Sequence, residues 1–320
     1  MKEDATPSTS RRHEKYDRLI AAAKKLQPLT TAVAHPCEET SLKGAIEAGE
    51  AGLIKPILVG PKAKIAAVAK EHSLDLGNIE IVDAPHSNGA AEKAVELVRT
   101  GKADLLMKGS LHTDELLAEV VKRETGLRTG RRISHVFVMD VPGHAQTLFI
   151  TDAAVNIAPD LEAKRDIIQN AIDLYTGLGL GTPKVAILSA VETVTPTIPS
   201  TIEAAALCKM ADRGQITGGE LDGPLAFDNA ISPEAARIKG IKSQVAGQAQ
   251  ILVVPDLEAG NMLAKNLTFL SHADAAGIVL GARVPIILTS RADHVRARMA
   301  SCAVAALLRH SQLAKQPIRA

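Results

Sequence analysis

The sequence predicts an α/β protein built from two doubly wound domains, each with a mostly parallel sheet. Short aliphatic runs alternate with longer helical segments, an order typical of parallel strands joined by helical crossovers. The aliphatic runs are continuous rather than alternating, as in strands that are covered on both faces. At 320 residues the chain is too long for one ordinary hydrophobic core, so we expect two domains.

Ten aliphatic runs are the predicted strands. In chain order they are residues 31–34, 56–59, 79–82, 104–107, 135–139, 147–151, 184–189, 251–254, 277–280 and 285–289. The Gly- and Arg-rich stretch 124–132 lies between regular segments and is the predicted domain boundary.

Three of the connecting helices have recognisable starts. Ser200 and Glu203 have the spacing of a capping box, so Ser200 is the expected N-cap of a helix that ends near Arg213. Asp160 and Thr113 are the expected N-caps of two further helices.

Composition argues against several classes of function. Two Tyr, four Phe and no Trp are too few rings for base-stacking nucleic-acid modules. The net charge of +1 gives no global field for polyanions. No apolar run approaches the roughly 18 residues of a membrane span. Three separated cysteines predict no disulfide framework, which fits a reducing cytoplasm. Residues 1–12 are polar, so we expect a flexible tail and not a secretory signal.

Several familiar catalytic motifs are absent from the sequence. It contains no G-x-G-x-x-G, no P-loop, no H-E-x-x-H and no G-x-S-x-G. Dinucleotide, P-loop, zinc-hydrolase and serine-hydrolase chemistry are therefore disfavoured, and no metal site is expected.

Polar clusters instead follow several predicted strands, where open α/β sheets bind ligands. In the first, Lys108 offers a charge, Gly109 allows close backbone approach, and Ser110, His112 and Thr113 lead into a helix whose free N–H groups suit an anion. A plain strand–helix turn is the alternative.

Two further clusters have structural alternatives. Asp152 and Asn156 form the second, which ordinary turn chemistry would also explain. The third, 222–230, is predicted as a loop with a half-buried apolar centre, and a structural loop between domains is the alternative.

The last two clusters lie near the end of the chain. Asp256 is a candidate helix cap, while Gly260, Asn261 and Lys265 follow it; Gly costs roughly 1 kcal/mol inside a helix, so ligand approach or close packing must justify it. In the stretch 290–293, a Ser-Arg pair could hold a phosphate, and its Asp could instead cap the next helix.

These clusters occur in an order that resembles the phosphate acetyltransferase/phosphate butyryltransferase family. The similar segments are 107–109, 150–156, 219–225, 254–261 and 288–291. The site composition is most similar to butyryl-type members and to the transferase part of bifunctional enoyl-CoA hydratase/phosphate acetyltransferases.

The resemblance implies transfer of a short acyl group, acetyl or butyryl, between coenzyme A and inorganic phosphate in a ternary complex. It also implies a homodimer with no bound cofactor, and an architecture like that of isocitrate and isopropylmalate dehydrogenases. In that architecture residues 13–131 with 287–320 form one domain, 132–286 form the other, and the substrates bind in the cleft between them.

By position, the resemblance makes Ser290 a donor to the acyl oxygen and Arg291 a clamp for phosphate or coenzyme A. Acetyl-type members have a basic Asp seven residues after this Ser, where the present chain has Ala297. Asp293 is the nearest substitute base and Asp256 the second. Arg132, which precedes Ser134, is a further candidate phosphate ligand.

Two other functions compete with acyl transfer. A metal- and NAD-dependent decarboxylating dehydrogenase of isopropylmalate type shares the two-domain shape but needs a Lys–Tyr pair, and the chain has only Tyr16 and Tyr175. A non-catalytic binder of coenzyme A is the second alternative, because of Ala297.

Overall fold

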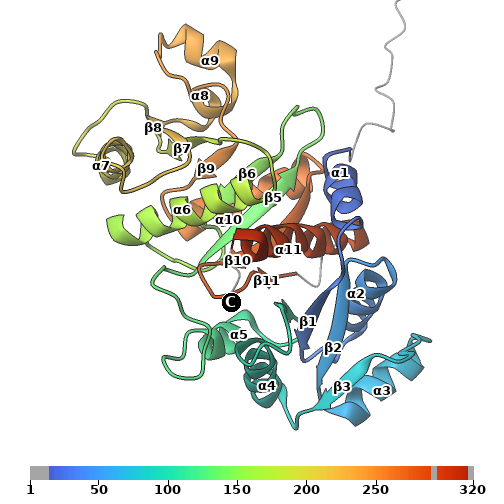
Figure 1. Cartoon of the computed structure of the whole chain (residues 1–320). Helices are drawn as coiled ribbons and strands as arrows, with labels where there is room; N and C mark the ends of the chain where they lie inside the picture. The colour runs from blue at the N-terminus through green and yellow to red at the C-terminus, as the bar shows by residue number, and fades with distance from the viewer. Residues whose placement is uncertain (1–13, 290–293, 316–320) are drawn as a thin grey trace, which may run out of the picture.

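The computed structural model describes residues 14–289 and 294–315 (Figure 1). Its strands are β1 (Leu29–Ala34), β2 (Ile54–Gly60), β3 (Glu80–Asp83), β4 (Leu105–Lys108), β5 (Ser134–Asp140), β6 (Leu148–Thr151), β7 (Lys184–Leu188), β8 (Glu220–Leu225), β9 (Ile251–Val253), β10 (Asp274–Leu280) and β11 (Ile286–Ile287). Its helices are α1 (Glu14–Ala23), α2 (Glu39–Glu50), α3 (Lys62–Glu71), α4 (Ser87–Arg99), α5 (Thr113–Val120), α6 (Leu161–Gly177), α7 (Pro199–Asp212), α8 (Phe227–Ile231), α9 (Pro233–Ile238), α10 (Leu257–Leu270) and α11 (Val295–Lys315).

All described strands join in one sheet, in the order β3-β2-β1-β4-β11-β10-β5-β6-β9-β7-β8. The sheet therefore runs through both predicted domains instead of forming two separate sheets. One half of the sheet consists of the parallel strands β3, β2, β1, β4 and β11. The other half consists of the parallel strands β6, β9, β7 and β8. Between these two halves, β10 pairs antiparallel with β11 and with β5, and β5 pairs antiparallel with β6.

The predicted strands are confirmed, since each of the ten runs overlaps a strand of the structure. One strand was missed: β8 occupies part of the stretch 222–230 that the sequence predicts as a loop, and α8 follows it. β8 is the last strand of the sheet, and an edge strand tolerates Gly223 and Pro224 because one side of it needs no ladder hydrogen bonds.

Two of the predicted helix starts were wrong. The N-cap of α7 is Ile198 and no side chain caps it, because Pro199 fixes the first helical turn and places Ser200 inside the helix. The N-cap of α5 is His112, and Thr113 is its first residue. The N-cap prediction for Asp160 is confirmed, since its carboxylate accepts a hydrogen bond from the N–H of Ala163.

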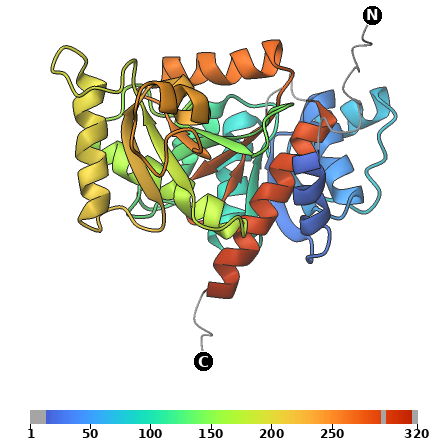
Figure 2. The ribbon, with the colours of Figure 1, turned by 90° about the horizontal axis from the view of Figure 1, so that it is seen from above.

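The hydrophobic core differs between the two faces of the sheet. On one face a single core runs through both halves beneath α1, α2, α6, α7 and α11. On the other face there are two separate cores, one beneath α4 and α5 and one beneath α8, α9 and α10. Figure 2 shows α10 and α11 on opposite faces. Of the two separate cores, the first reaches Val279 on β10 and Ile286 on β11, and the second reaches Met139 on β5. We call this strip of the face, over β11, β10 and β5, the seam.

A single row of paired residues crosses the seam. It runs from Met107 on β4 through Ile287, Ile278 and Val136 to Thr151 on β6. Strands β4 and β6 run in opposite directions, yet β6 ends at this row and β4 ends one residue beyond it. The loops after these strands therefore border the seam from its two sides, four strand spacings or about 19 Å apart along the sheet.

Candidate functional site

The loop after β6 is organised by the carboxylate of Asp152, which is 3% exposed. Its Oδ1 accepts hydrogen bonds of 3.0 Å from the N–H groups of Ala154 and Val155, and its Oδ2 accepts from the N–H and the side-chain amide of Asn156 at 3.1 and 2.5 Å. All four bonds stay within this loop. Turn chemistry, one of the two interpretations of the sequence, therefore describes Asp152.

Asn156 links the Asp152 carboxylate to the side chain of Arg132. The buried amide of Asn156 donates to the carbonyl of Ile133 at 2.8 Å, and its Oδ1 accepts from Arg132 Nε at 2.9 Å. Among the described residues, the two terminal guanidinium nitrogens of Arg132 have no hydrogen-bond partner. An exposed guanidinium held at Nε presents its remaining donors in a fixed orientation, which suits bidentate binding of a phosphate.

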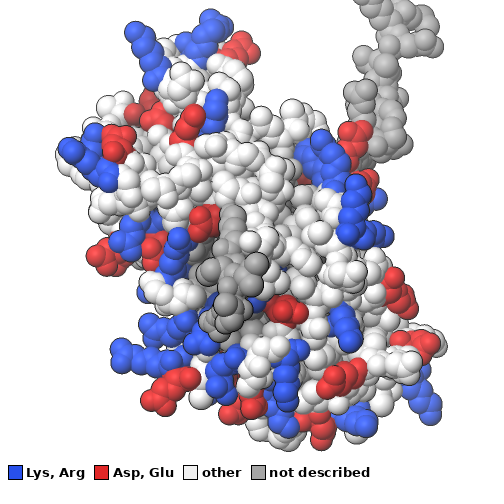
Figure 3. Space-filling model, viewed as in Figure 1, with Lys and Arg blue, Asp and Glu red and all other residues white. Residues whose placement is uncertain are grey.

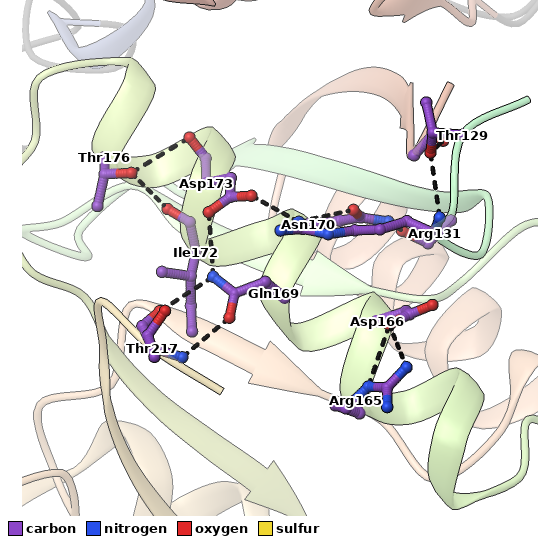
Figure 4. A network of polar contacts seen from close by, with 12 residues as sticks. Thr129, Arg131, Arg165, Asp166, Gln169, Asn170, Ile172, Asp173, Thr176 and Thr217 are labelled. Carbon is purple, nitrogen blue, oxygen red and sulfur yellow. Dashed lines mark hydrogen bonds and ion pairs between the residues drawn. The ribbon is translucent and has the colours of Figure 1, made fainter. Parts of the chain in front are cut away.

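Helix α6 holds the backbone of the segment before β5. Asn170 donates to the carbonyl of Arg132 and to the hydroxyl of Ser134, both at 2.9 Å, and the N–H of Arg132 donates to Asp166 at 2.9 Å. Ser134 is fully buried, so in this structure its hydroxyl supports the segment. Figure 4 shows the neighbouring contacts, in which Arg131 pairs with Asp173 at 2.5 Å.

Helix α10 packs closely against the Asp152 loop. A Cβ atom at Gly260 would lie 2.9 Å from the Cβ of Ala153, so the glycine allows this approach. The side chain of Asn261 donates to the carbonyl of Ala153 at 3.2 Å, and Asp256 caps the helix through the N–H of Ala259. Close packing therefore accounts for Gly260, and Lys265 is exposed one turn later.

The cluster after β4 has its own contacts, on the other side of the seam. A Cβ atom at Gly109 would collide with the carbonyl oxygen of Ala34, so only glycine fits here. The Ser110 hydroxyl donates to the carbonyl of His35 at 2.7 Å and accepts from the N–H of Cys37 at 3.2 Å. Lys108 Nζ donates to the carbonyl of Gly109 at 3.2 Å. His112 and Thr113 begin α5.

The structure thus brings some of the predicted site residues together. Arg132, Asp152 and Asn156 form one hydrogen-bonded group, with Ser134 behind it and Gly260 and Asn261 packed beside it. Lys108, Gly109 and Ser110 form a second group. The seam separates the two groups.

His135 lies at the seam and is not among the site residues predicted from the sequence. It is 1% exposed, its ring stacks edge-on against Phe137 at 4.3 Å between centroids, and its Nδ1 has no hydrogen-bond partner. Burial lowers the pKa of this imidazole to about 4, although the charge of Asp152 opposes the shift. The ring is therefore neutral at pH 7.

The catalytic residues implied by the resemblance, Ser290, Arg291 and Asp293, lie outside the described residues. The chain that leads to them is described as far as Thr289. Leu288 lies at the seam, with its N–H donating to the carbonyl of Gly277 at 3.2 Å. Ala297, the position at which the resemblance to acetyl-type members implies an Asp, is buried in the first turn of α11.

A groove of about 710 Å³ lies beside Arg132 and Asn156. Three further arginines line the groove: Arg128 and Arg131 from the segment before β5, and Arg165 from α6. Figure 3 shows Lys and Arg side chains gathered at the left of the molecule, between α5 and α6. The Arg-rich stretch was visible in the sequence as a domain boundary, but its proximity to α6 depends on the tertiary fold.

No group of three or more His, Cys, Asp or Glu side chains in residues 14–289 and 294–315 is arranged to hold a metal ion. A helix that could span a membrane is likewise absent from these ranges.

Comparison with known proteins identifies the family. The model of the family described as "Phosphate acetyl/butaryl transferase" matches residues 86–306. The chain belongs to this family. It is 78% identical over 293 residues to a phosphate acetyltransferase of Rhizobium meliloti, covering 92% of this chain and 93% of the relative. It is 43% identical over 293 residues to a phosphate butyryltransferase of Clostridium acetobutylicum, covering 92% and 97%.

A solved structure of the same type supports the assignment. The crystal structure of a branched-chain phosphotransacylase from Enterococcus faecalis superposes with a TM-score of 0.77 at 32% identity, covering 88% of this chain and 99% of the other. Membership in the family disfavours the dehydrogenase alternative. Both tyrosines also lie in structural positions: Tyr16 bonds to the carbonyl of Val138, and Tyr175 packs on Phe149.

Proposed function

We propose that this protein transfers a short acyl group, acetyl or butyryl, between coenzyme A and inorganic phosphate. Family membership supports the reaction class. The observation that carries the proposal within this structure is the guanidinium of Arg132, which the Asp152–Asn156 pair fixes at Nε while its outer nitrogens face no described partner. Such a group suits a tetrahedral oxyanion like phosphate.

The reaction makes three physical demands. The coenzyme A thiol, with a free pKa near ~8.5, must lose its proton before it attacks acyl phosphate. The carbonyl oxygen gains charge in the transition state and needs preorganised donors, each worth roughly 3–4 kcal/mol. The departing phosphate needs cations. Attack forms the new C–S bond, breaks the C–O bond to phosphate, and leaves the thiol proton on a base.

We assign these demands to the residues that match the family pattern. Ser290 donates to the acyl oxygen, Arg291 holds phosphate or coenzyme A, and Arg132 assists from the other side of the seam. Asp293 is the proposed base. Asp256 is the weaker choice because its carboxylate caps α10. Lys108 and the start of α5 are the proposed anion contacts from the first half of the sheet.

The seam is the proposed floor of the substrate cleft. The separate cores on this face support that position, since each half can move over the seam without breaking a shared core there. Residues 13–131 with 287–320 form the proposed first domain and 132–286 the second. We also propose a cytoplasmic homodimer that uses coenzyme A as a substrate and needs no bound cofactor.

Initial-rate kinetics on Ser290→Ala and Arg291→Ala test the residue roles. We expect both variants to remain folded and to lose at least a hundredfold in kcat, as when an oxyanion donor is removed. Intersecting double-reciprocal plots in the wild type would show that both substrates bind before the chemistry occurs. Full activity in both variants would contradict the assignment, and parallel plots would contradict direct transfer.

A further inference from the structure

One aromatic side chain interrupts the buried surface of the seam. Every residue of β5 is buried except Phe137, which is partly exposed. Successive side chains of a strand point to opposite faces of the sheet, and Phe137 shares its face with Met139 and with its partner on β6, Ile150. Both of those residues lie in the core beneath α8, α9 and α10. The exposed part of the Phe137 ring therefore faces the seam.

The partner of Phe137 on the other neighbouring strand, β10, has no side chain. This partner is Gly277. Its N–H donates to the hydroxyl of Ser301 and its carbonyl accepts from the N–H of Leu288, so both groups bond away from β5. The pair is therefore of the non-hydrogen-bonded kind, in which antiparallel residues lie closest together. The Phe137 ring thus has no side chain beside it on β10.

The ring of Phe137 is held in place by His135, two residues earlier on the same face of β5. The two rings meet edge-on, with 4.3 Å between their centroids. His135 is itself 1% exposed, so the surrounding core fixes its position. An aromatic pair of this geometry restrains both rings. Phe137 therefore presents a fixed apolar surface to the space above the seam.

We propose that Phe137 limits the length of the acyl group that the enzyme accepts, because its ring forms the floor on which the acyl chain rests. The inference rests on the proposed function, which assigns the acyl oxygen to Ser290. Leu288 bonds to the residue that pairs with Phe137, and it precedes Ser290 by two residues, a span of at most roughly 7 Å. A short straight acyl chain that extends from its carbonyl towards the sheet meets the Phe137 ring.

Ratios of kcat/KM between acyl groups test this floor, because the fraction of folded protein cancels within each variant. Phe137→Ala should raise the ratio of hexanoyl-CoA to acetyl-CoA at least tenfold, since each methylene newly buried contributes roughly fourfold. Phe137→Trp, with a larger ring, should lower the ratio of butyryl-CoA to acetyl-CoA about fourfold. Phe227→Ala is the matched control: Phe227 is also partly buried against the same core but lies on α8, and its loss should leave both ratios unchanged.

Calorimetric titration with S-ethyl- and S-hexyl-coenzyme A supplies a readout independent of turnover, because these thioethers have no acyl group to transfer. The affinity for the hexyl compound relative to the ethyl compound should rise at least tenfold in Phe137→Ala. Should that variant not fold, Phe137→Trp decides the point, with a relative affinity for the hexyl compound that falls below that of the wild type.

An active wild type whose folded Phe137 variants keep its kinetic and affinity ratios would overturn the role of Phe137 alone. Equal gains in Phe137→Ala and Phe227→Ala would also overturn it, because they would reflect a general loosening of the core. A wild type that turns over no acyl-CoA would overturn the proposed function, while the thioether affinities still decide whether Phe137 limits the length of the chain.

Discussion

The carbonyl oxygen of Leu288 lies over Gly277, in the space that a side chain at position 277 would occupy. The N–H of Gly277 does not bond to β11 but to the hydroxyl of Ser301 on α11, at 3.1 Å. The chain after β11 therefore leaves the plane of the sheet at Leu288, on the face where the two cores separate. His135 Nε2 would lie 3.0 Å from the same missing Cβ. Gly277 thus directs the chain that leads to Ser290.

Gly277→Ala should lower kcat by at least tenfold, because its Cβ would collide with backbone and displace the chain before Ser290. The matched control is Gly89→Ala on α4, where the added Cβ meets only ordinary contacts of 3.4 Å or more. That variant should keep its activity and gain up to about 1 kcal/mol of stability from higher helix propensity. Assays of the two purified variants, with circular dichroism to confirm folding, decide the point. Equal activities would show that the Leu288 path does not matter.

Asn156→Ala should weaken phosphate binding and stability together. The substitution removes the partner of Arg132 Nε and leaves the carbonyl of Ile133 without its bond. We expect about a tenfold higher KM for phosphate and a loss of about 1–3 kcal/mol in the free energy of unfolding. Asn266→Ala on the exposed side of α10 is the control, and it should change the KM for phosphate and the free energy of unfolding only slightly. An unchanged KM in the Asn156 variant would mean that Arg132 does not bind phosphate.

Local chemistry was readable from the sequence, and long-range pairing was not. Asp160 and Asp256 were recognisable as helix caps because their partners lie three residues away. The Arg132–Asn156 bond joins residues 24 apart, and only the pairing of β5 with β6 brings them together. β8 escaped prediction because its sequence, Glu220–Leu225, has the Gly-Pro composition of a turn. The proline before Ser200 overrode a capping box of correct spacing.

Acid should destabilise the protein through His135. Burial puts its pKa at about 4 in the folded state, below the 6.5 of an unfolded chain, so the folded state binds fewer protons. Its contribution is fully present above pH 6.5 and is lost as the pH falls towards 4, by about 3 kcal/mol in total. Urea unfolding at pH 7 and pH 4.5 measures this loss. His135→Asn should reduce the change in the free energy of unfolding between these two pH values. His272→Asn, an exposed control, should leave that change as large as in the wild type. An equal change in both variants would contradict the role of His135.

The cysteines should be unreactive in the native protein. Burial raises the pKa of Cys37 to about 11 and those of Cys208 and Cys302 to about 12, so almost no thiolate exists at neutral pH. Treatment with iodoacetamide at pH 7.5 should leave the mass and the activity of the native enzyme unchanged, and labelling should require denaturant. Rapid modification of Cys37 with loss of activity would instead indicate a protein thiol in the chemistry, in place of the thiol of coenzyme A.

Acyl transfer itself is tested most directly by incubating the purified protein with acetyl-, propionyl- or butyryl-CoA and inorganic phosphate. Release of free coenzyme A and formation of the acyl phosphate would be followed in the same reaction. We predict equimolar appearance of both products, dependent on phosphate and saturable in each substrate, with at least one of the three acyl groups. A folded protein that forms no acyl phosphate from any of them would contradict the account.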